Sequence, residues 1–140
     1  MTDLRIEGVS VTDLLALPSE EFDALVMTNS PVSFRAGTAN VLGKFGRVGD
    51  RLILELGHID GGGEGVLPMI ASLAQTYSHR HGLSHIEWIV HAVNCQAPNS
   101  KLRRILERRG FAIRDMPGVG EVYYRSVQPD HAVDRATPDR

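Results

Sequence analysis

The stretch HIDGGGEGVLPMIASL, residues 58–73, places three consecutive glycines, and a fourth after Glu64, between two apolar runs. The first run ends at Ile59, and the second begins at Val66 with the spacing of a helix. Glycines between a strand and a helix let backbone amides approach a phosphate. The acids Asp60 and Glu64 flank these glycines and would repel a phosphate. The stretch therefore predicts a strand, a glycine turn and a helix, with a phosphate cradle or a plain flexible turn as the two interpretations.

The composition indicates a single compact domain. Of the 140 residues, 42% are hydrophobic and 23% are charged, which is enough for one hydrophobic core. A net charge of -2 gives no broad electrostatic reason to expect binding to nucleic acid or to a membrane. Cys95 is the single cysteine and cannot form an internal disulfide, and no signal peptide or membrane-length apolar segment is evident. We expect a cytoplasmic protein, monomer or homodimer, whose partners are small molecules or proteins.

The first half of the chain predicts a weak strand, a short helix and an antiparallel meander. Residues 4–11 alternate weakly, as a strand does, and Ser19 is placed to cap a helix whose first turn holds Glu20 and Glu21. Segments rich in β-branched and aromatic residues follow, separated by glycine-containing turns. These predicted strands are residues 31–37, 38–46 and 51–59.

The second half predicts helix, strand, helix and hairpin. A helix over 66–81 is expected to end at Gly82, and residues 83–93, apolar on both faces, form a central strand. A second helix is capped by Asn99 and ends at Gly110. The buried stripe of this helix is expected to be Leu102, Ile105 and Leu106. Residues 111–116 and 121–127 are expected to form the hairpin. The domain covers residues 1–127, and residues 128–140 are expected to form a disordered tail.

Two motifs stand on either side of the predicted central strand. Residues 60–65 read Asp-Gly-Gly-Gly-Glu-Gly, and Asn99 is followed eleven residues later by Gly110-Phe111. Both resemble signatures of the GNAT superfamily of acyl-CoA N-acyltransferases, whose loop reads Arg/Gln-x-x-Gly-x-Gly/Ala. Both diagnostic glycines match, whereas the leading Arg or Gln is Asp60 in this chain. The resemblance covers about residues 31–127 and implies an α/β fold with a mixed, largely antiparallel central sheet flanked by helices.

The resemblance also implies a coenzyme and its site. In such enzymes the amides of the loop and of the helix start bind the pyrophosphate of coenzyme A, so acetyl-CoA or another acyl-CoA is the expected cofactor. Gly57 would mark a bulge that opens a slot for the pantetheine arm. The expected coenzyme-binding residues are Ile59, Gly61, Gly62, Gly63, Glu64, Gly65, Val66 and Asn99.

The expected chemistry is attack of an amine on a thioester, with a base to remove a proton and an acid to protonate the thiolate. Glu55 and His58 lie near the place where the family has its base, although such strand-end residues are also commonly just solvated. Leu106 occupies the position of the family's tyrosine acid. Tyr123 and Tyr124 point to opposite faces of the last strand, so one at most is a substitute acid, and Tyr124 is the candidate.

Other chemistry-bearing residues fit ordinary roles as well. The four histidines at positions 79, 81, 85 and 91 match no metal-ligand spacing, and we expect no metal. Cys95 is either a nucleophile or a small buried apolar residue, and the basic residues of 101–109 either reach a coenzyme phosphate or form a solvated helix face.

The leading hypothesis is an N-acyltransferase that acts on an amine of a small molecule or a protein. The alternatives are a catalytically silent module that binds coenzyme A or a protein, and a structural α/β protein without a cofactor.

Overall fold

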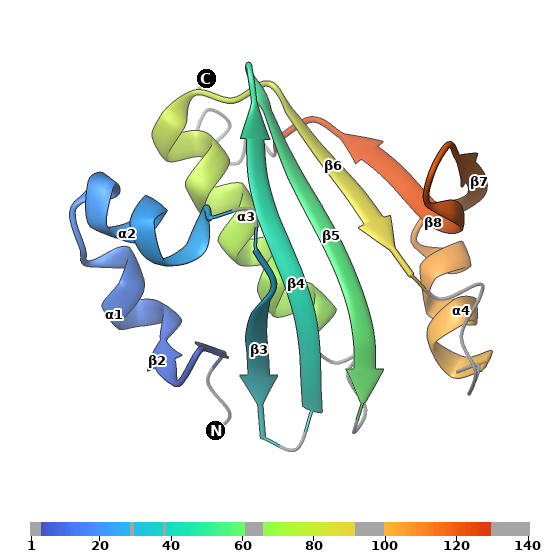
Figure 1. Ribbon diagram of the computed structural model, residues 1–140, viewed down its shortest axis with the longest axis horizontal. Helices are drawn as coiled ribbons and strands as arrows, with labels where there is room; N and C mark the ends of the chain where they lie inside the picture. Colours follow the sequence, from blue (N-terminus) through green and yellow to red (C-terminus); the bar gives the residue numbers. More distant parts are fainter. Residues whose placement is uncertain (1–3, 29, 38, 61–65, 92–99, 130–140) are drawn as a thin grey trace, which may run out of the picture.

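The protein is a mixed α/β structure built on one sheet (Figure 1). The computed structural model describes residues 4–28, 30–37, 39–60, 66–91 and 100–129. In this part of the chain eight strands form a sheet in the order β2-β1-β3-β4-β5-β6-β8-β7. Every neighbouring pair is antiparallel except β5 and β6, which run parallel. The expected mixed, largely antiparallel sheet with flanking helices is therefore confirmed.

The centre of the sheet is the predicted meander. It consists of β3 (Val32–Ala36), β4 (Ala39–Val48) and β5 (Arg51–Asp60). Gly37 and Gly49 lie in the two turns with φ of 62° and 60°, a left-handed conformation that glycine adopts without strain. Buried and half-exposed residues alternate along β4, so one face of the sheet is covered and the other meets solvent.

The N-terminal segment differs from the predicted single strand. It forms two short strands, β1 (Arg5–Ile6) and β2 (Val9–Ser10), and then helix α1 (Val11–Leu15). The chain reverses at Glu7 and Gly8, both with positive φ, and the Ser10 side chain accepts a hydrogen bond from the Asp13 amide as the helix cap. Weak alternation over eight residues cannot reveal such a reversal.

Helices α2 (Ser19–Val26) and α3 (Leu67–His81) pack on the covered face of the sheet. Glu20 and Glu21 occupy the first turn of α2 as expected, but Ser19 is already helical and Pro18 precedes it without a side-chain cap, so the predicted Ser19 cap is wrong. Tyr77 of α3 stacks on Phe22 of α2, with ring centroids 5.5 Å apart. Gly82 ends α3 in a left-handed conformation, as predicted.

The C-terminal half completes the sheet. Strand β6 (His85–Val90) lies between β5 and β8, which confirms its central position. Helix α4 (Ser100–Arg108) follows, and β7 (Ala112–Met116) pairs with β8 (Gly120–Val127) as the predicted hairpin. Leu102 and Leu106 are buried as expected, whereas Ile105 is half-buried. Asn99 lies outside the described residues, so the structure does not test its predicted capping role.

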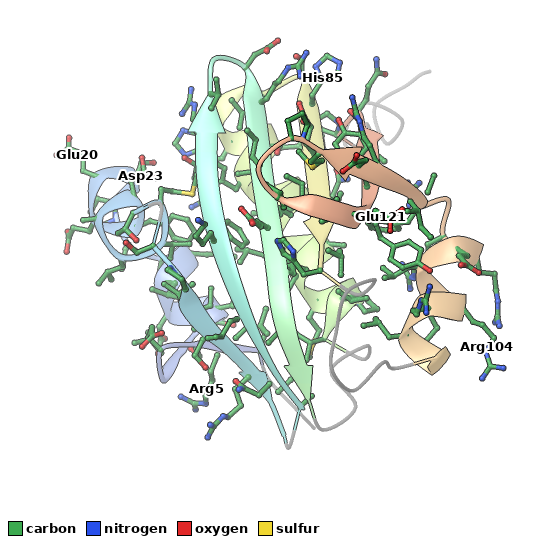
Figure 2. The ribbon with its side chains drawn as sticks, turned by 45° about the vertical axis from the view of Figure 1, so that its right-hand side comes forward. Arg5, Glu20, Asp23, His85, Arg104 and Glu121 are labelled. Carbon is green, nitrogen blue, oxygen red and sulfur yellow. The ribbon has the colours of Figure 1, made fainter. Side chains whose placement is uncertain are left out.

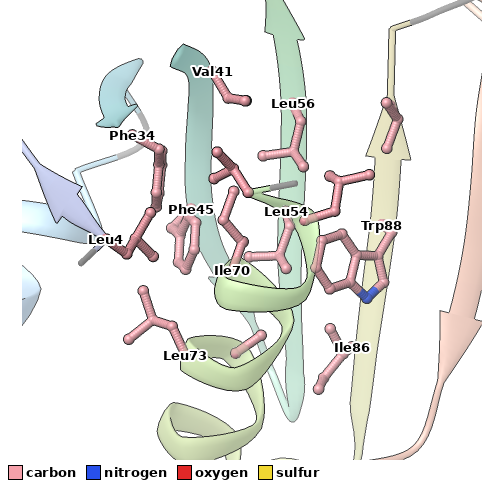
Figure 3. Close-up of a cluster of buried hydrophobic side chains, with 14 of the residues drawn as sticks. Leu4, Phe34, Val41, Phe45, Leu54, Leu56, Ile70, Leu73, Ile86 and Trp88 are labelled. Atoms are coloured by element: carbon pink, nitrogen blue, oxygen red, sulfur yellow. The ribbon is translucent and has the colours of Figure 1, made fainter. Parts of the chain in front are cut away.

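The hydrophobic core lies between the covered face of the sheet and α3 (Figure 3). Phe34 and Phe45 stack with centroids 5.2 Å apart, and Leu54 and Leu56 of β5 face Ile70 of α3. The other face, which we call the open face, carries Lys44, Glu55, Glu87 and Tyr124. Among the described residues, none of the helices is long and apolar enough to span a bilayer.

Candidate functional site

Glu55 projects from the middle of β5 onto the open face. Its neighbours Leu54 and Leu56 are fully buried on the covered face, and strand alternation therefore directs Glu55 the other way. Lys44 stands directly opposite on β4, with its Nζ 3.9 Å from Glu55 Oε1. About a third of the Glu55 side chain is exposed, so its carboxylate is accessible from solvent.

His91 meets Glu55 at the end of the parallel strand pair. Its amide donates a hydrogen bond to the Leu56 carbonyl oxygen at 2.9 Å, which continues the β5–β6 ladder by one step. Its Nε2 lies 2.7 Å from Glu55 Oε2, and 38% of its side chain is exposed. With Nε2 protonated, the imidazole donates to the carboxylate, which fixes the orientation of the ring. We call these two residues the Glu55–His91 pair.

The described pairing of β5 with β6 ends next to this pair. The β5–β6 register runs from Arg51 opposite His85 to Leu56 opposite Val90. Strand β6 ends there, whereas β5 continues to Asp60 with only β4 as its partner among the described residues. Gly57 was expected to mark a bulge that separates β5 from the next strand, but the register shift observed directly after Gly57 lies between β5 and β4, where β5 has one more residue than β4 between the Gly57–Leu42 and Asp60–Asn40 pairs. Among the described residues, the edge of β5 beyond Leu56 therefore has no partner on its β6 side.

A cavity of about 230 Å³ opens on the same spot. It is lined by apolar Pro31 and Leu42 and by the polar groups of Lys44 and the Glu55–His91 pair. Gly57 also lines it, and a Cβ at this position would lie 3.8 Å from His91 Cβ, in ordinary contact. The cavity thus presents a hydrogen-bonded carboxylate and imidazole to a small polar group, which is an arrangement that accepts protons.

The predicted coenzyme residues fall largely outside the described part of the chain. Gly61, Gly62, Gly63, Glu64, Gly65 and Asn99 are not described, and of His58 and Ile59 only the backbone, as part of β5, is described. Val66 is fully buried, and its carbonyl oxygen accepts the hydrogen bond from the Ile70 amide at 3.0 Å. Helix α3 begins immediately afterwards, and the first turn of its described residues contains no acid. The positive end of its dipole is thus not neutralised within that turn.

Tyr124, the candidate acid, lies on the open face. Ile89 of β6 is opposite both Glu55 and Tyr124, so Tyr124 stands two strands from Glu55 in the same row. Its hydroxyl donates to Glu87 Oε1 at 3.1 Å, and the Arg114 guanidinium lies 4.4 Å from its ring centroid. The proposed acid role of Tyr124 stays a prediction.

The region of α4 offers a different tyrosine. Leu106 is fully buried, and this position has no ionisable group. Tyr123 lies on the covered face, donates to Glu107 Oε2 at 2.8 Å and accepts from Arg103 Nε at 3.2 Å. The expectation that Tyr123 and Tyr124 occupy opposite faces is thus confirmed.

His91 is a site residue that the sequence brought up only as one of four possible metal ligands, and not as a partner of Glu55. Its partner is 36 residues away, and only the parallel register of β5 and β6 brings the two together. The register of the two parallel strands was the signal that could have found it. A strand whose first residue, His85, lies opposite Arg51 places its seventh residue, His91, beside Gly57. Among the described residues no group of three metal-binding side chains occurs, and His79, His81, His85 and His91 do not form one.

Comparisons with known proteins find similarity of structure but not of sequence. No family model matches this chain, and no curated protein sequence matches it. The ribosomal-protein-S18-alanine N-acetyltransferase from Escherichia coli aligns over 92% of this chain and 96% of its own, with a TM-score of 0.47 and 15% identity. A PaiA N-acetyltransferase from Thermoplasma acidophilum, solved in complex with coenzyme A, aligns over 89% and 99%, with a TM-score of 0.45 and 12% identity. A putative N-acetyltransferase from Lactobacillus plantarum aligns over 91% and 98%, with a TM-score of 0.44 and 9% identity.

Proposed function

We propose that this protein is a divergent member of the GNAT superfamily that transfers an acyl group, most simply acetyl, from acyl-CoA to an amine of a small molecule or a protein. The observation that supports this most directly is the Glu55–His91 pair, which lines a cavity at the point where the described pairing of β5 and β6 ends. A proton acceptor in a cavity beside the edge of β5 fits a reaction in which an amine must lose a proton as it attacks.

The residues present fit the coenzyme in two respects. The backbone of β5 beyond Leu56 has no partner strand on its β6 side among the described residues, and it can pair with the amides of a pantetheine arm. Helix α3 starts directly after residues 61–65 without an acid in its first turn, and its dipole favours a phosphate there. Gly61, Gly62, Gly63, Glu64, Gly65, Val66, Ile59 and Asn99 would hold the coenzyme, which supplies the acyl group as a thioester.

The Glu55–His91 pair would prepare the acceptor. Alkylamines are mostly protonated near pH 7, because their pKa resembles the value of about 10.4 for lysine. His91 accepts a proton from the amine while Glu55 holds the ring and stabilises the imidazolium that forms. His58 remains the other candidate base on β5, and Tyr124 the candidate acid.

A second function is favoured by one observation. Leu106, fully buried, stands where the family has its tyrosine acid, so the departing thiolate has no proton donor from this position. A catalytically silent protein that binds coenzyme A or a protein partner would tolerate this change. Reaction and binding must therefore be measured separately.

Thermal unfolding with acetyl-CoA, CoA and ADP tests binding. A ligand that binds only the folded state raises the unfolding temperature by mass action, and we expect acetyl-CoA and CoA to do so at millimolar concentration. Absence of a shift with all three ligands would remove both coenzyme-dependent functions.

Release of free thiol from acetyl-CoA with polyamines, amino acids and peptides, at a rate that increases with pH, would establish transfer. Binding without thiol release would favour the silent protein.

A further inference from the structure

A second cavity, of about 370 Å³, lies on the covered face of the sheet. We call it the α3–β8 cavity. Its walls are Leu67 and Ala71 of α3, Trp88 of β6 and Phe111 after α4, and its rim includes Arg109 and Arg125. This volume lies within the range of about 300–1,000 Å³ that small-molecule sites occupy.

The α3–β8 cavity is separate from the Glu55–His91 pair. Trp88 points to the covered face, whereas Glu87 and Ile89, its neighbours on β6, point to the open face. Strand β6 therefore forms a wall between the two cavities. A ligand in the α3–β8 cavity does not contact the Glu55 carboxylate.

Two guanidinium groups give this cavity its charge. Both Arg109 and Arg125 line it, and among the described residues neither forms an ion pair. A Cβ added at Gly110, two residues after the end of α4, would lie 3.6 Å from Arg125 Nε, so this guanidinium lies near the C-terminal end of α4, where a cation is stabilised by the helix dipole. Planar guanidinium groups recognise carboxylates through paired hydrogen bonds.

The floor of the cavity is apolar and aromatic. Trp88 is 7% exposed and meets the edge of Phe111, with centroids 6.3 Å apart at 76°. Leu67 and Ala71 form the opposite wall. A ligand that fits must therefore combine one anionic group with a small apolar body.

We propose that the α3–β8 cavity binds a small organic acid, whose carboxylate pairs with Arg125 and Arg109 and whose apolar body lies against Trp88 and Phe111. This site is distinct from the acyl-transfer site and does not depend on the proposed function. Phenylacetate and hexanoate have this chemistry, and their amides keep the shape without the charge.

Trp88 is the only tryptophan of the chain, so intrinsic fluorescence reports on this cavity directly. Titration of the coenzyme-free protein with phenylacetate or hexanoate should give a saturable change in emission, and phenylacetamide or hexanamide should not. Arg125→Gln should weaken binding of the acids about tenfold or more, because it removes a hydrogen-bonded charge. Arg104→Gln is the matched control, since Arg104 is exposed, projects outward from α4 (Figure 2) and does not line the cavity.

Ala71→Leu provides a second variant that leaves both arginines in place. It fills part of the cavity and should also weaken binding of the acids, with the fold checked by circular dichroism. Equal responses to acids and amides, or equal affinities of the acids for Arg125→Gln and Arg104→Gln, would overturn the proposal. Weakening of CoA binding by Arg125→Gln would assign the cavity to the coenzyme and would also overturn it. If the protein releases no thiol from acetyl-CoA but binds the acids as expected in the fluorescence titration, the proposal of acyl transfer fails and the proposal for this cavity stands.

Discussion

His91 Nε2 lies 2.7 Å from Glu55 Oε2, and this contact joins the end of β6 to the middle of β5 across 36 residues of chain. It exists because the two strands are parallel and in a register that sets Glu55 opposite Ile89. An antiparallel β6, or a shift of one residue, would turn His91 toward the covered face or away from Glu55. The Glu55–His91 contact is therefore a product of sheet topology.

Glu55→Gln should lower the rate of thiol release by about 100- to 10,000-fold, the usual contribution of a positioned base. The side chain keeps its size but loses the charge that stabilises protonated His91. The thermal shift with CoA should stay unchanged, because the coenzyme is expected to bind through the backbone of β5 beyond Leu56 and the start of α3, and not through the Glu55 carboxylate. Glu20→Gln, on the solvent side of α2, is the control (Figure 2). Full activity of the Glu55→Gln protein would exclude the proposed role of Glu55 in stabilising protonated His91.

His91→Gln extends this test to the pair. If Glu55 acts through His91, the double variant should be about as slow as the slower single variant, since residues that act as a unit are not additive. The coupling between Glu55 and His91 follows from the rates of thiol release of the unchanged protein, the two single variants and the double variant, measured under identical conditions. Multiplied losses in the double variant would show that the two residues act independently.

The strands and hairpins could be predicted because alternation and turn glycines are local signals. Gly37, Gly49 and Gly82 all adopt the positive φ that their positions suggested. The reversal at Glu7 and Gly8 was missed because two-residue strands leave no alternation to detect. Contacts such as Glu55–His91 depend on which strands become neighbours, and local periodicity does not encode this.

Gly43→Ala should lower the free energy of unfolding by about 1–3 kcal/mol. A Cβ at this position would lie 2.8 Å from Leu56 Cδ2 and 2.9 Å from Phe34 Cε1, so the core must shift to admit it. Gly57→Ala is the matched control on the neighbouring strand, where the nearest atom, His91 Cβ, is 3.8 Å away. Urea denaturation of both variants measures the difference. Equal midpoints would show that the core adapts without cost.

Ser84→Ala should destabilise the protein near pH 7 and have less effect in acid. The Ser84 hydroxyl donates a hydrogen bond to the Asp50 carboxylate, which lowers the pKa of Asp50 below its usual value. A depressed pKa in the folded state means that this stabilisation is complete above the unfolded pKa of about 3.9 and is lost as the pH falls through the folded pKa. The melting temperatures of the unchanged protein and of Ser84→Ala should therefore converge as the pH is lowered from about 6 to about 2. A constant difference over this range would indicate that the charge of Asp50 is not involved.

Asp60→Arg tests the phosphate site at the end of β5. Asp60 is the last residue of β5 and pairs with Asn40, directly before residues 61–65. A carboxylate about 4 Å from a phosphate costs about 1 kcal/mol in water-like surroundings, and an arginine there contributes a similar amount in the opposite sense. Together these two changes amount to about 2 kcal/mol, so CoA should bind about thirtyfold more tightly to the variant at low salt, and the gain should shrink as salt screens the charges. Calorimetric titration measures this, with Glu20→Arg as a control that makes the same change of charge on α2. If a folded Asp60→Arg protein binds CoA no more tightly than the Glu20→Arg protein, the pyrophosphate does not lie at this loop, and its glycines serve the turn between β5 and α3.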